Sequence, residues 1–364
     1  MIGLDKRLLF SFDWLWFLAL LGLAGAGALA IWSTTSGTGL NSYFDRQMIY
    51  IGGSLVVFFA LLCFDYRFFS DKLVIIYIVM MVAMCLVPVI GHGVRGNIRW
   101  LQLGPVAIQP SEFAKIVAIL ALAKYYSGID SDYLKFKEFA MSAAIFFVPA
   151  GMVLLHGDLG TAMIFVPVFA TMSLMAGVRR RYVITALLVA IIAVPLGWPL
   201  LRGYQKERIE TAFNPYKDPH GGGYQSIQSM IAIGSGQFKG KGLGQGSQGN
   251  LGFLPARHTD FVFSVLAEEI GFIGSITILA LYLFVLSRLF ITVCEARDKL
   301  GAMIVSGFAA MIFGHIVINI GMVIGMLPIT GIPLPFISAG GSSLIACFIA
   351  MGISMSVRMR RYVN

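Results

Sequence analysis

The residue type best suited to chemistry is an acid, Asp260, at the point where a polar segment meets a long apolar one. The junction reads Leu254-Pro255-Ala256-Arg257-His258-Thr259-Asp260-Phe261-Val262-Phe263. A charge at membrane depth costs about 2.5–3.5 kcal/mol, so a carboxylate there must be hydrated, paired or used. Spacing alone leaves two interpretations of Asp260 open: a cap of the following helix, or a general base that takes a proton from a hydroxyl.

A second charged pair, Glu112 and Lys115, stands three residues apart and hence on one helix face. One interpretation is a structural ion pair that lets two charges exist near lipid. The other is a cavity wall on which Lys115 meets a substrate phosphate. Neither interpretation excludes the other.

Further polar residues also have structural interpretations. Asp158 either caps the helix that follows it or contacts substrate. His258 and Asp260 are two metal ligand types, but two ligands do not define a site, so no dedicated metal site is expected. Adjacent Glu268 and Glu269 point in different directions, so one of them should face the bundle interior. His315 and Asn319 are expected to form interhelical hydrogen bonds.

The segment 221–252 is rich in glycine, which predicts a mobile loop whose backbone can approach a ligand closely. Lys239 and Lys241 within it suit an anionic head group. Gly240-Lys241-Gly242 is no Walker A, since neither the earlier glycine nor the following Ser or Thr is present. Without a nucleotide motif, the energy for any synthesis must arrive with the substrate, and a sugar on a lipid diphosphate fits.

Composition places the chain in a membrane. It has 364 residues, of which 58% are hydrophobic and 12% charged, against roughly 25% charged in soluble domains. The net charge of +9 is expected to hold cytoplasmic loops in place rather than to bind nucleic acid. The four cysteines are scattered and indicate neither disulfides nor a metal site.

Apolar runs of about 20 residues recur throughout, which predicts an all-α polytopic membrane protein of about ten transmembrane helices. The expected helices are 14–33, 46–64, 73–90, 110–127, 139–155, 160–177, 182–201, 261–290, 301–324 and 338–357. Helices 1–7 fill residues 1–201, a Gly-rich extracytoplasmic loop spans 202–259, and helices 8–10 fill 260–364, all in one integral membrane domain. Lys and Arg concentrate at one set of helix ends, which predicts that both termini are cytoplasmic.

Several segments together resemble the SEDS family of bacterial cell-wall proteins, which includes RodA and FtsW. The similar segments are Gln109-Pro110-Ser111-Glu112-Phe113-Ala114-Lys115, Gly157-Asp158-Leu159-Gly160-Thr161, Tyr224-Gln225-x-x-Gln228-Ser229, Ala232-Ile233-Gly234-Ser235-Gly236, Leu254-Pro255-x-Arg257-His258-Thr259-Asp260-Phe261, Ala267-Glu268-Glu269-Ile270-Gly271 and Pro333-Leu334-Pro335-Phe336-Ile337-Ser338-x-Gly340-Gly341-Ser342. They run in consistent order, and features such as Arg257 before His258 resemble RodA more than FtsW.

The resemblance implies a peptidoglycan glycosyltransferase that polymerises lipid II on the outer face of the bacterial cytoplasmic membrane during elongation. It implies that Asp260 is the catalytic base. The expected substrate-binding residues are Glu112, Lys115, Asp158, Gln228, Lys239, Lys241, Arg257, His258 and Ser338. It further implies a class B penicillin-binding protein as partner, MreC and MreD as neighbours, and a divalent cation, Mg²⁺ or Mn²⁺, that assists. Two rival functions stay open: a lipid II flippase, and a non-catalytic scaffold for a transpeptidase.

Overall fold

The structure, a computed structural model, is nearly all helical and describes most of the chain. The described residues are 10–35, 41–94, 97–103, 106–131, 133–185, 188, 199, 203, 206, 210–211, 215–219, 221, 223–247, 253–254 and 256–362. Among them, seven helices are long and apolar enough to cross a membrane by length and composition.

The long helices follow one another along the chain, with a sheet between α5 and α6 and a long polar segment between α8 and α13. They are α2 (Trp14–Thr35), α3 (Asn41–Leu62), α5 (Leu73–Ile90), α6 (Pro110–Ser127), α7 (Phe136–Leu155), α8 (Leu159–Met175), α13 (Val262–Cys294), α14 (Lys299–Val323) and α15 (Gly341–Met359). Two shorter helices accompany them, α4 (Tyr66–Asp71) and α11 (Tyr224–Ser235), with a 3-10 turn, η2 (Pro215–Lys217).

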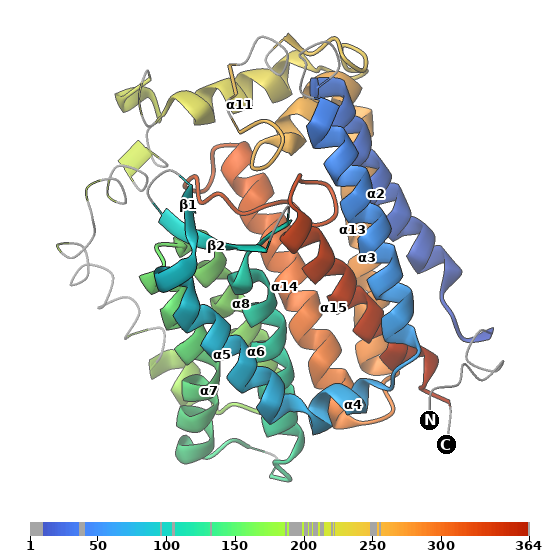
Figure 1. Cartoon of the computed structure of the whole chain (residues 1–364), viewed down its shortest axis with the longest axis vertical. Coiled ribbons are helices and arrows are strands. Elements are labelled where there is room, and N and C mark those ends of the chain that lie inside the picture. Colours follow the sequence, from blue (N-terminus) through green and yellow to red (C-terminus); the bar gives the residue numbers. More distant parts are fainter. Residues whose placement is uncertain are drawn as a thin grey trace.

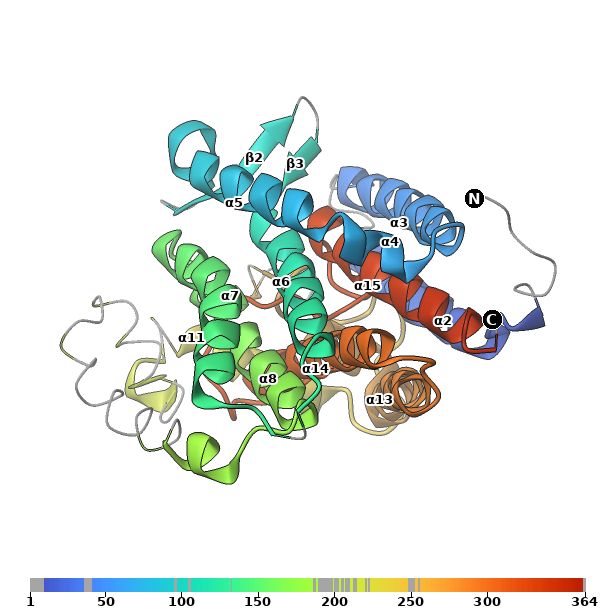
Figure 2. The ribbon, with the colours of Figure 1, turned by 90° about the horizontal axis from the view of Figure 1, so that it is seen from below.

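The long helices form a bundle whose two ends differ in content. Helix α2 begins and α15 ends at one end, called here the terminal end, where α4 also lies (Figure 1). Helix α11 and a small sheet lie toward the opposite, distal end. Seen along the bundle, α14 lies at the centre, among α6, α8, α13 and α15 (Figure 2).

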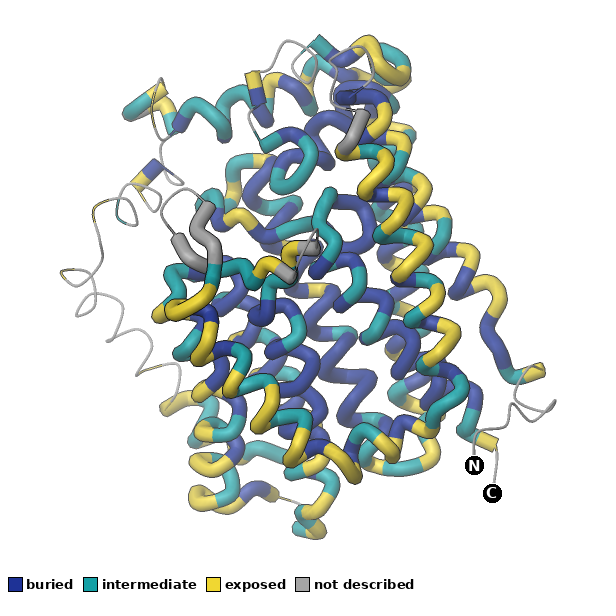
Figure 3. Tube along the Cα trace, in the orientation of Figure 1, coloured by how far each residue is buried: buried dark blue, intermediate teal, exposed yellow. Residues whose placement is uncertain are grey.

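Burial follows this arrangement. Helices α14 and α15 are mostly buried, whereas α5 buries little of its apolar surface against the rest of the chain. In Figure 3 the buried segments run through the middle of the bundle and the exposed ones along its outer helices. Apolar side chains that face outward over the length of a helix are what a lipid environment requires.

Between α5 and α6 the chain forms a three-stranded antiparallel sheet. Its strands are β1 (His92–Val94), β2 (Asn97–Leu103) and β3 (Val106–Ile108), in the order β1-β2-β3. Gly93 lies opposite Ile98, and Leu101 lies opposite Ile108. Strand β3 leads through Gln109 directly into α6, so the sheet fixes where that helix begins.

Helix positions largely match the periodicity of the sequence, and the differences are local. The expected helix 110–127 has the observed bounds, and most other ends differ by a few residues. The expected helix 182–201 falls mainly outside the described residues. Three elements were not expected: α4, the sheet, and α11 within the segment predicted to be loop. That segment is therefore partly helical, because Tyr224–Ser235 presents apolar residues to α13 and α14.

Candidate active site

Asp260 lies in the turn before α13, which starts at Val262 with Phe261 as its N-cap. The main chain of this turn is fixed from both sides. The Asp260 N–H donates to the carbonyl of Ala256 at 3.1 Å. The Asn319 amide on α14 donates to the Asp260 carbonyl at 3.0 Å and to the Ile332 carbonyl at 2.7 Å. One side chain thus ties the acid to the segment 324–340 between α14 and α15, called here the clamp loop.

The clamp loop holds the residues on either side of the acid as well. The Ser338 hydroxyl donates to the Thr259 carbonyl at 2.6 Å and accepts from the Leu334 N–H at 2.8 Å. The Ala339 N–H donates to the His258 carbonyl at 2.8 Å. Ser338 therefore positions main chain in this structure, and its expected contact with substrate stays a prediction.

The clamp loop also separates Asp260 from the start of α8. A Cβ added to Gly331 would lie 3.5 Å from Oδ2 of Asp260, so the carboxylate faces this glycine. A Cβ added to Gly160 would lie only 2.5 Å from the carbonyl oxygen of Thr330. Gly331 and Gly160 have no side chains, so Asp260 and the first turn of α8 can both pack closely against the clamp loop, at Gly331 and Thr330.

Asp158 caps α8, which confirms the structural interpretation of this acid. Its Oδ1 accepts from the Thr161 N–H at 3.3 Å, and its Oδ2 accepts from the Thr161 hydroxyl and the Gln109 amide, both at 2.9 Å. Nη1 of Arg99 on β2 lies 3.4 Å from Oδ1. Asp158 is buried, so it joins the sheet, the start of α6 and α8. Arg99 was not singled out from the sequence, because it is one basic residue in a short loop.

Glu112 and Lys115 form the expected ion pair, with Nζ at 3.1 Å from both carboxylate oxygens. A third partner was not expected: Nζ lies 2.8 Å from Nε2 of His315 on α14. Nδ1 of His315 lies 2.7 Å from the Met311 carbonyl, so Nδ1 carries the proton and Nε2 accepts from Lys115. The three ammonium donors are thus all used, and Glu112 and Lys115 are only 2% and 3% exposed.

His315 and Asn319 lie one turn apart on α14, and both make the hydrogen bonds between segments that their spacing indicated. His315 receives the Lys115 ammonium, and Asn319 holds Asp260. The central helix therefore connects the buried ion pair to the acid through one helical turn.

His258 faces α2 rather than a metal site. Its Nδ1 lies 2.8 Å from the hydroxyl oxygen of Thr34, and its ring stacks on Tyr43 with centroids 5.4 Å apart. The side chain of Arg257 donates to Nε2 at 3.4 Å. Burial, and then the charge of Arg257, lower the pKa of His258 to about 4. The imidazole is therefore neutral at pH 7, and Arg257 is the cation beside the acid.

The glycine-rich segment approaches α13 closely, and its predicted approach to a ligand stays a prediction. The N–H groups of Lys241 and Gly242 both donate at 3.0 Å, to the carbonyls of Glu268 and Glu269. There α13 is kinked at Gly271, where φ is 67° and ψ is −165°. A Cβ on Gly240 would lie 2.1 Å from the Glu269 carbonyl oxygen, so only glycine fits.

This contact buries both neighbouring acids, whereas only one was expected to face inward. Oε1 of Glu268 accepts from Nζ of Lys241 at 2.6 Å and from the Ser247 N–H at 2.8 Å. Oε1 of Glu269 accepts from the Ser33 hydroxyl on α2 and from the Gly244 N–H. Lys241, predicted to bind a head group, is thus paired with Glu268, and a substrate role for it stays a prediction.

The remaining predicted residues lie apart from this group. Lys239 is exposed next to the kink, and Gln228 is half-buried on α11. The neighbour of Gln228, Ser229, was not predicted to matter. Its hydroxyl donates to the Val323 carbonyl at 2.6 Å and contacts the Ser264 hydroxyl at 2.8 Å, so it ties α11 to α13 and α14.

Within the described part of the chain, no three His, Cys, Asp or Glu side chains gather as a metal site. His258, the one ring nitrogen ligand beside Asp260, is already bonded through both nitrogens. The residues present do not fit a protein-bound divalent cation, and no step of the chemistry below depends on one.

Comparison with known proteins explains this arrangement. The sequence matches the family model of the FtsW, RodA and SpoVE proteins, described as "Cell cycle protein", over residues 7–363. The chain belongs to this family. It is a polytopic membrane protein, as the apolar helices and these relatives together indicate.

Two further matches cover almost the whole length of the chain. Peptidoglycan glycosyltransferase MrdB of Escherichia coli K12 is 36% identical over 345 residues, which are 94% of this chain and 92% of that protein. The crystal structure of RodA from Thermus thermophilus is 28% identical, with a TM-score of 0.74 over 97% of this chain and 98% of that one.

A third match is a chain of the structure described as "Structural coordination of polymerization and crosslinking by a peptidoglycan synthase complex". That chain is 30% identical, with a TM-score of 0.85 over 97% of this chain and 99% of its own. The FtsW/RodA/SpoVE fold therefore extends over the full helical bundle described above, the clamp loop included.

Proposed function

We propose that this protein is a peptidoglycan glycosyltransferase that polymerises lipid II during cell elongation, with Asp260 as its general base. The observation that carries the proposal is the placement of Asp260: an acid at the mouth of α13 whose main chain is immobilised by Asn319. The 36% identity to a peptidoglycan glycosyltransferase over 94% of the chain supports it.

The reaction makes one glycosidic bond and breaks the bond between the donor sugar and its diphosphate. Asp260 removes the proton from the 4-hydroxyl of an acceptor GlcNAc, and that oxygen attacks the anomeric carbon of the donor MurNAc. The bond from that carbon to the diphosphate oxygen breaks, and undecaprenyl diphosphate leaves with inversion from α to β. A base must lie within hydrogen-bond reach of the hydroxyl in a fixed direction, which the bonds from Asn319 and Ser338 to the neighbouring main chain provide.

Charge on the departing diphosphate needs cations, and the three lysines predicted to bind substrate divide into two kinds. Lys239 is exposed beside the α13 kink, so it is suited to meet an incoming anion. Lys115 and Lys241 are held by Glu112 and Glu268, so in this conformation they shape the site instead. A divalent cation, Mg²⁺ or Mn²⁺, would be carried by the substrate diphosphate rather than by a protein cluster.

The proposed orientation places the distal end, with α11 and the sheet, outside the cytoplasmic membrane. The likeness to a chain of a peptidoglycan synthase complex supports a transpeptidase partner, which we assign to the class B penicillin-binding proteins. MreC and MreD complete the proposed assembly. Glu112–Lys115 and Glu268–Lys241 are ion pairs in which each cation is matched by a carboxylate, which favours a polymerase over the charged path that a flippase needs.

The test uses the full chain copurified with its penicillin-binding protein, fluorescent lipid II, and penicillin to block crosslinking. Asp260→Asn removes the base while it keeps the shape of the side chain. Asp71→Asn, the same change on exposed α4 at the terminal end, is the matched control. We expect glycan ladders from the wild type and the control and none from Asp260→Asn at an equal melting temperature.

Other outcomes assign other roles. Ladders from Asp260→Asn as well would remove Asp260 as base. Absence of ladders from every sample, combined with lipid II scrambling in liposomes, would support the flippase. Absence of both activities would support the scaffold.

A further inference from the structure

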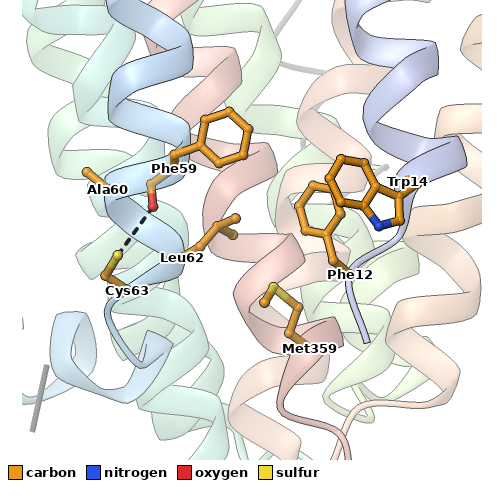
Figure 4. A pocket seen from close by; sticks show the side chains of 7 residues that line it. All are labelled: Phe12, Trp14, Phe59, Ala60, Leu62, Cys63 and Met359. Atoms are coloured by element: carbon orange, nitrogen blue, oxygen red, sulfur yellow. Dashed lines mark hydrogen bonds between the residues drawn. The ribbon is translucent and has the colours of Figure 1, made fainter. Parts of the chain in front are cut away.

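An apolar pocket of about 310 Å³ opens at the terminal end of the bundle, far along the chain from Asp260. Its lining consists of apolar or weakly polar side chains from three segments packed together: the start of α2, the end of α3 and the end of α15. These residues are Phe12, Trp14, Phe59, Ala60, Leu62, Cys63 and Met359 (Figure 4). A dry pocket of this kind takes an alkyl chain and offers nothing to a polar ligand.

A second pocket, of about 220 Å³, adjoins the first and has the opposite character. Phe12 and Trp14 line both pockets, so the two lie side by side across these residues. The second pocket is lined by residues 10–15 and by three arginines, Arg288, Arg358 and Arg361. The apolar pocket and the charged pocket therefore share one wall, which Phe12 and Trp14 form.

The arginines exceed the acids that hold them. Asp13 accepts from Arg288 and lies 2.9 Å from Nε of Arg358. Glu295 lies 2.8 Å from Nη1 of Arg361 and 3.4 Å from Nη1 of Arg358. Three guanidinium groups face two carboxylates, which leaves one positive charge. The neighbouring Arg360 is balanced by Asp65 at 3.6 Å.

Two nitrogens of Arg361 lack a hydrogen-bond partner in the described part of the chain, Nε and Nη1, although Nη1 lies 2.8 Å from the Glu295 carboxylate. Nε of Arg361 is buried and makes no hydrogen bond within the described part of the chain. A buried donor without a partner is unfavourable, so an acceptor at this point would stabilise the structure. An anion in the second pocket would supply both the acceptor and the missing negative charge.

The exposed side chains around the two pockets indicate how deep these pockets lie in the membrane. Trp14 is 60% exposed and Leu15 is 66% exposed, in a chain whose outer surface faces lipid. Tryptophan at a helix end marks the boundary between head groups and acyl chains. The charged pocket thus lies at head-group level, and the apolar one opens toward the acyl region.

We propose that the two pockets together bind one anionic phospholipid, with its phosphate at Arg361 and Arg288 and an acyl chain between α3 and α15. Basic pockets between transmembrane helices are known to accept such head groups. A free phosphate ion would use only the charged pocket, whereas a charged pocket beside an apolar one fits a molecule with a charged head and an apolar tail. The site is independent of the glycosyltransferase proposal.

The experiment measures lipid binding to the purified full chain in detergent by native mass spectrometry. Phosphatidylglycerol, phosphatidylcholine and inorganic phosphate are the three probes. Arg361→Gln leaves Glu295 paired with Arg358, and Arg288→Gln leaves Asp13 paired with Arg358, so both variants are expected to fold. Arg67→Gln is the matched control, since Arg67 on α4 pairs with Asp298, the N-cap of α14, outside both pockets.

We expect phosphatidylglycerol to bind more tightly than phosphatidylcholine, and each pocket variant to weaken it by about fivefold while the control does not. Ala60→Phe, which fills the apolar pocket, should weaken phosphatidylglycerol further and leave phosphate binding unchanged. Equal binding of the two lipids, or indifference to Arg361→Gln, would overturn the proposal. Displacement of lipid by inorganic phosphate alone, with no effect of Ala60→Phe, would replace it with a simple anion site.

Discussion

Asn319 shows how a single side chain can fix a reactive group without touching its reactive atoms. Both of its amide hydrogens are used, one on the Asp260 carbonyl and one on the Ile332 carbonyl. A carboxylate in its place would have no hydrogen to donate, so the residue must be an amide. These bonds hold the main chain of Asp260, and with it the point from which the carboxylate projects.

At the same scale, the buried pair predicts a specific mutational pattern. Lys115→Met should destabilise the protein by about 3–5 kcal/mol, because Glu112 would keep a buried charge without a partner. The double variant Glu112→Gln/Lys115→Met removes both charges and should recover most of the stability and the polymerase activity. Thermal unfolding in detergent and glycan ladders measure the two quantities.

The single variant Glu112→Gln serves as the reciprocal control, since it strands Lys115 instead. Stability that returns in the double variant without polymerisation would assign Lys115 a direct contact with substrate. An undisturbed Lys115→Met variant would contradict both interpretations.

The individual residues that could be predicted from the sequence are those whose charge is unfavourable at their position in or beside an apolar helix. Asp260 and the Glu112–Lys115 pair stand out because charge is costly in apolar helices. Their partners do not, since His315 lies 200 residues from Lys115 and Arg99 lies 58 residues from the carbonyl of Gly157 that it contacts. Contacts over such separations are set by packing of helices, which one sequence does not reveal.

At the scale of elements, the contact between the glycine segment and α13 is the least regular part of the bundle. Gly240 and Gly271 both have positive φ, at 78° and 67°, and each would place a Cβ within 2.3 Å of the other segment's backbone. The N–H groups that the kink frees bond across to this segment: Phe272 to the Gln237 carbonyl at 2.8 Å, and Ile273 to that of Phe238 at 3.2 Å. The kink and the loop thus stabilise each other.

This arrangement predicts a difference between two glycines of the same backbone conformation. Gly240→Ala should detach the segment from α13, because strain at positive φ is joined by a clash with the Glu269 carbonyl. Gly244→Ala, at φ 74° with nothing within 4 Å, carries the strain alone, of order 1–3 kcal/mol. Limited proteolysis should cleave the 236–247 segment faster in Gly240→Ala than in Gly244→Ala. Equal rates in the two would show that the contact does not hold the segment.

The long helices could be predicted because a run of about 20 apolar residues in a membrane satisfies its backbone hydrogen bonds as a helix and in few other structures. Helix α6 and the start of α13 were placed by a proline and an acid at their first turns. The sheet was not predicted, since its strands have only three to seven residues each. Helix α11 was hidden for a different reason, because the glycines around it indicate loop.

For the whole molecule, the unequal distribution of basic residues predicts which end faces the cytoplasm. In a cysteine-free background, Arg67→Cys places a thiol at the terminal end and Lys239→Cys places one near the distal end, and both positions are exposed. A membrane-impermeant maleimide applied to spheroplasts should label Lys239→Cys and spare Arg67→Cys, with both labelled after lysis. The reverse pattern would invert the topology and remove lipid II outside the membrane as the substrate.

The clamp loop has a consequence for how the chain is made. The groups that fix the turn of Asp260 belong to Asn319, Ser338 and Ala339, all of them synthesised 59 or more residues after it. Chains emerge from the ribosome N-terminus first, so α13 enters the membrane before any of these groups exists. A nascent chain that stops before the clamp loop therefore carries the acid without Ser338 and Ala339, and the loop that leads into the final helix is the segment that completes the site.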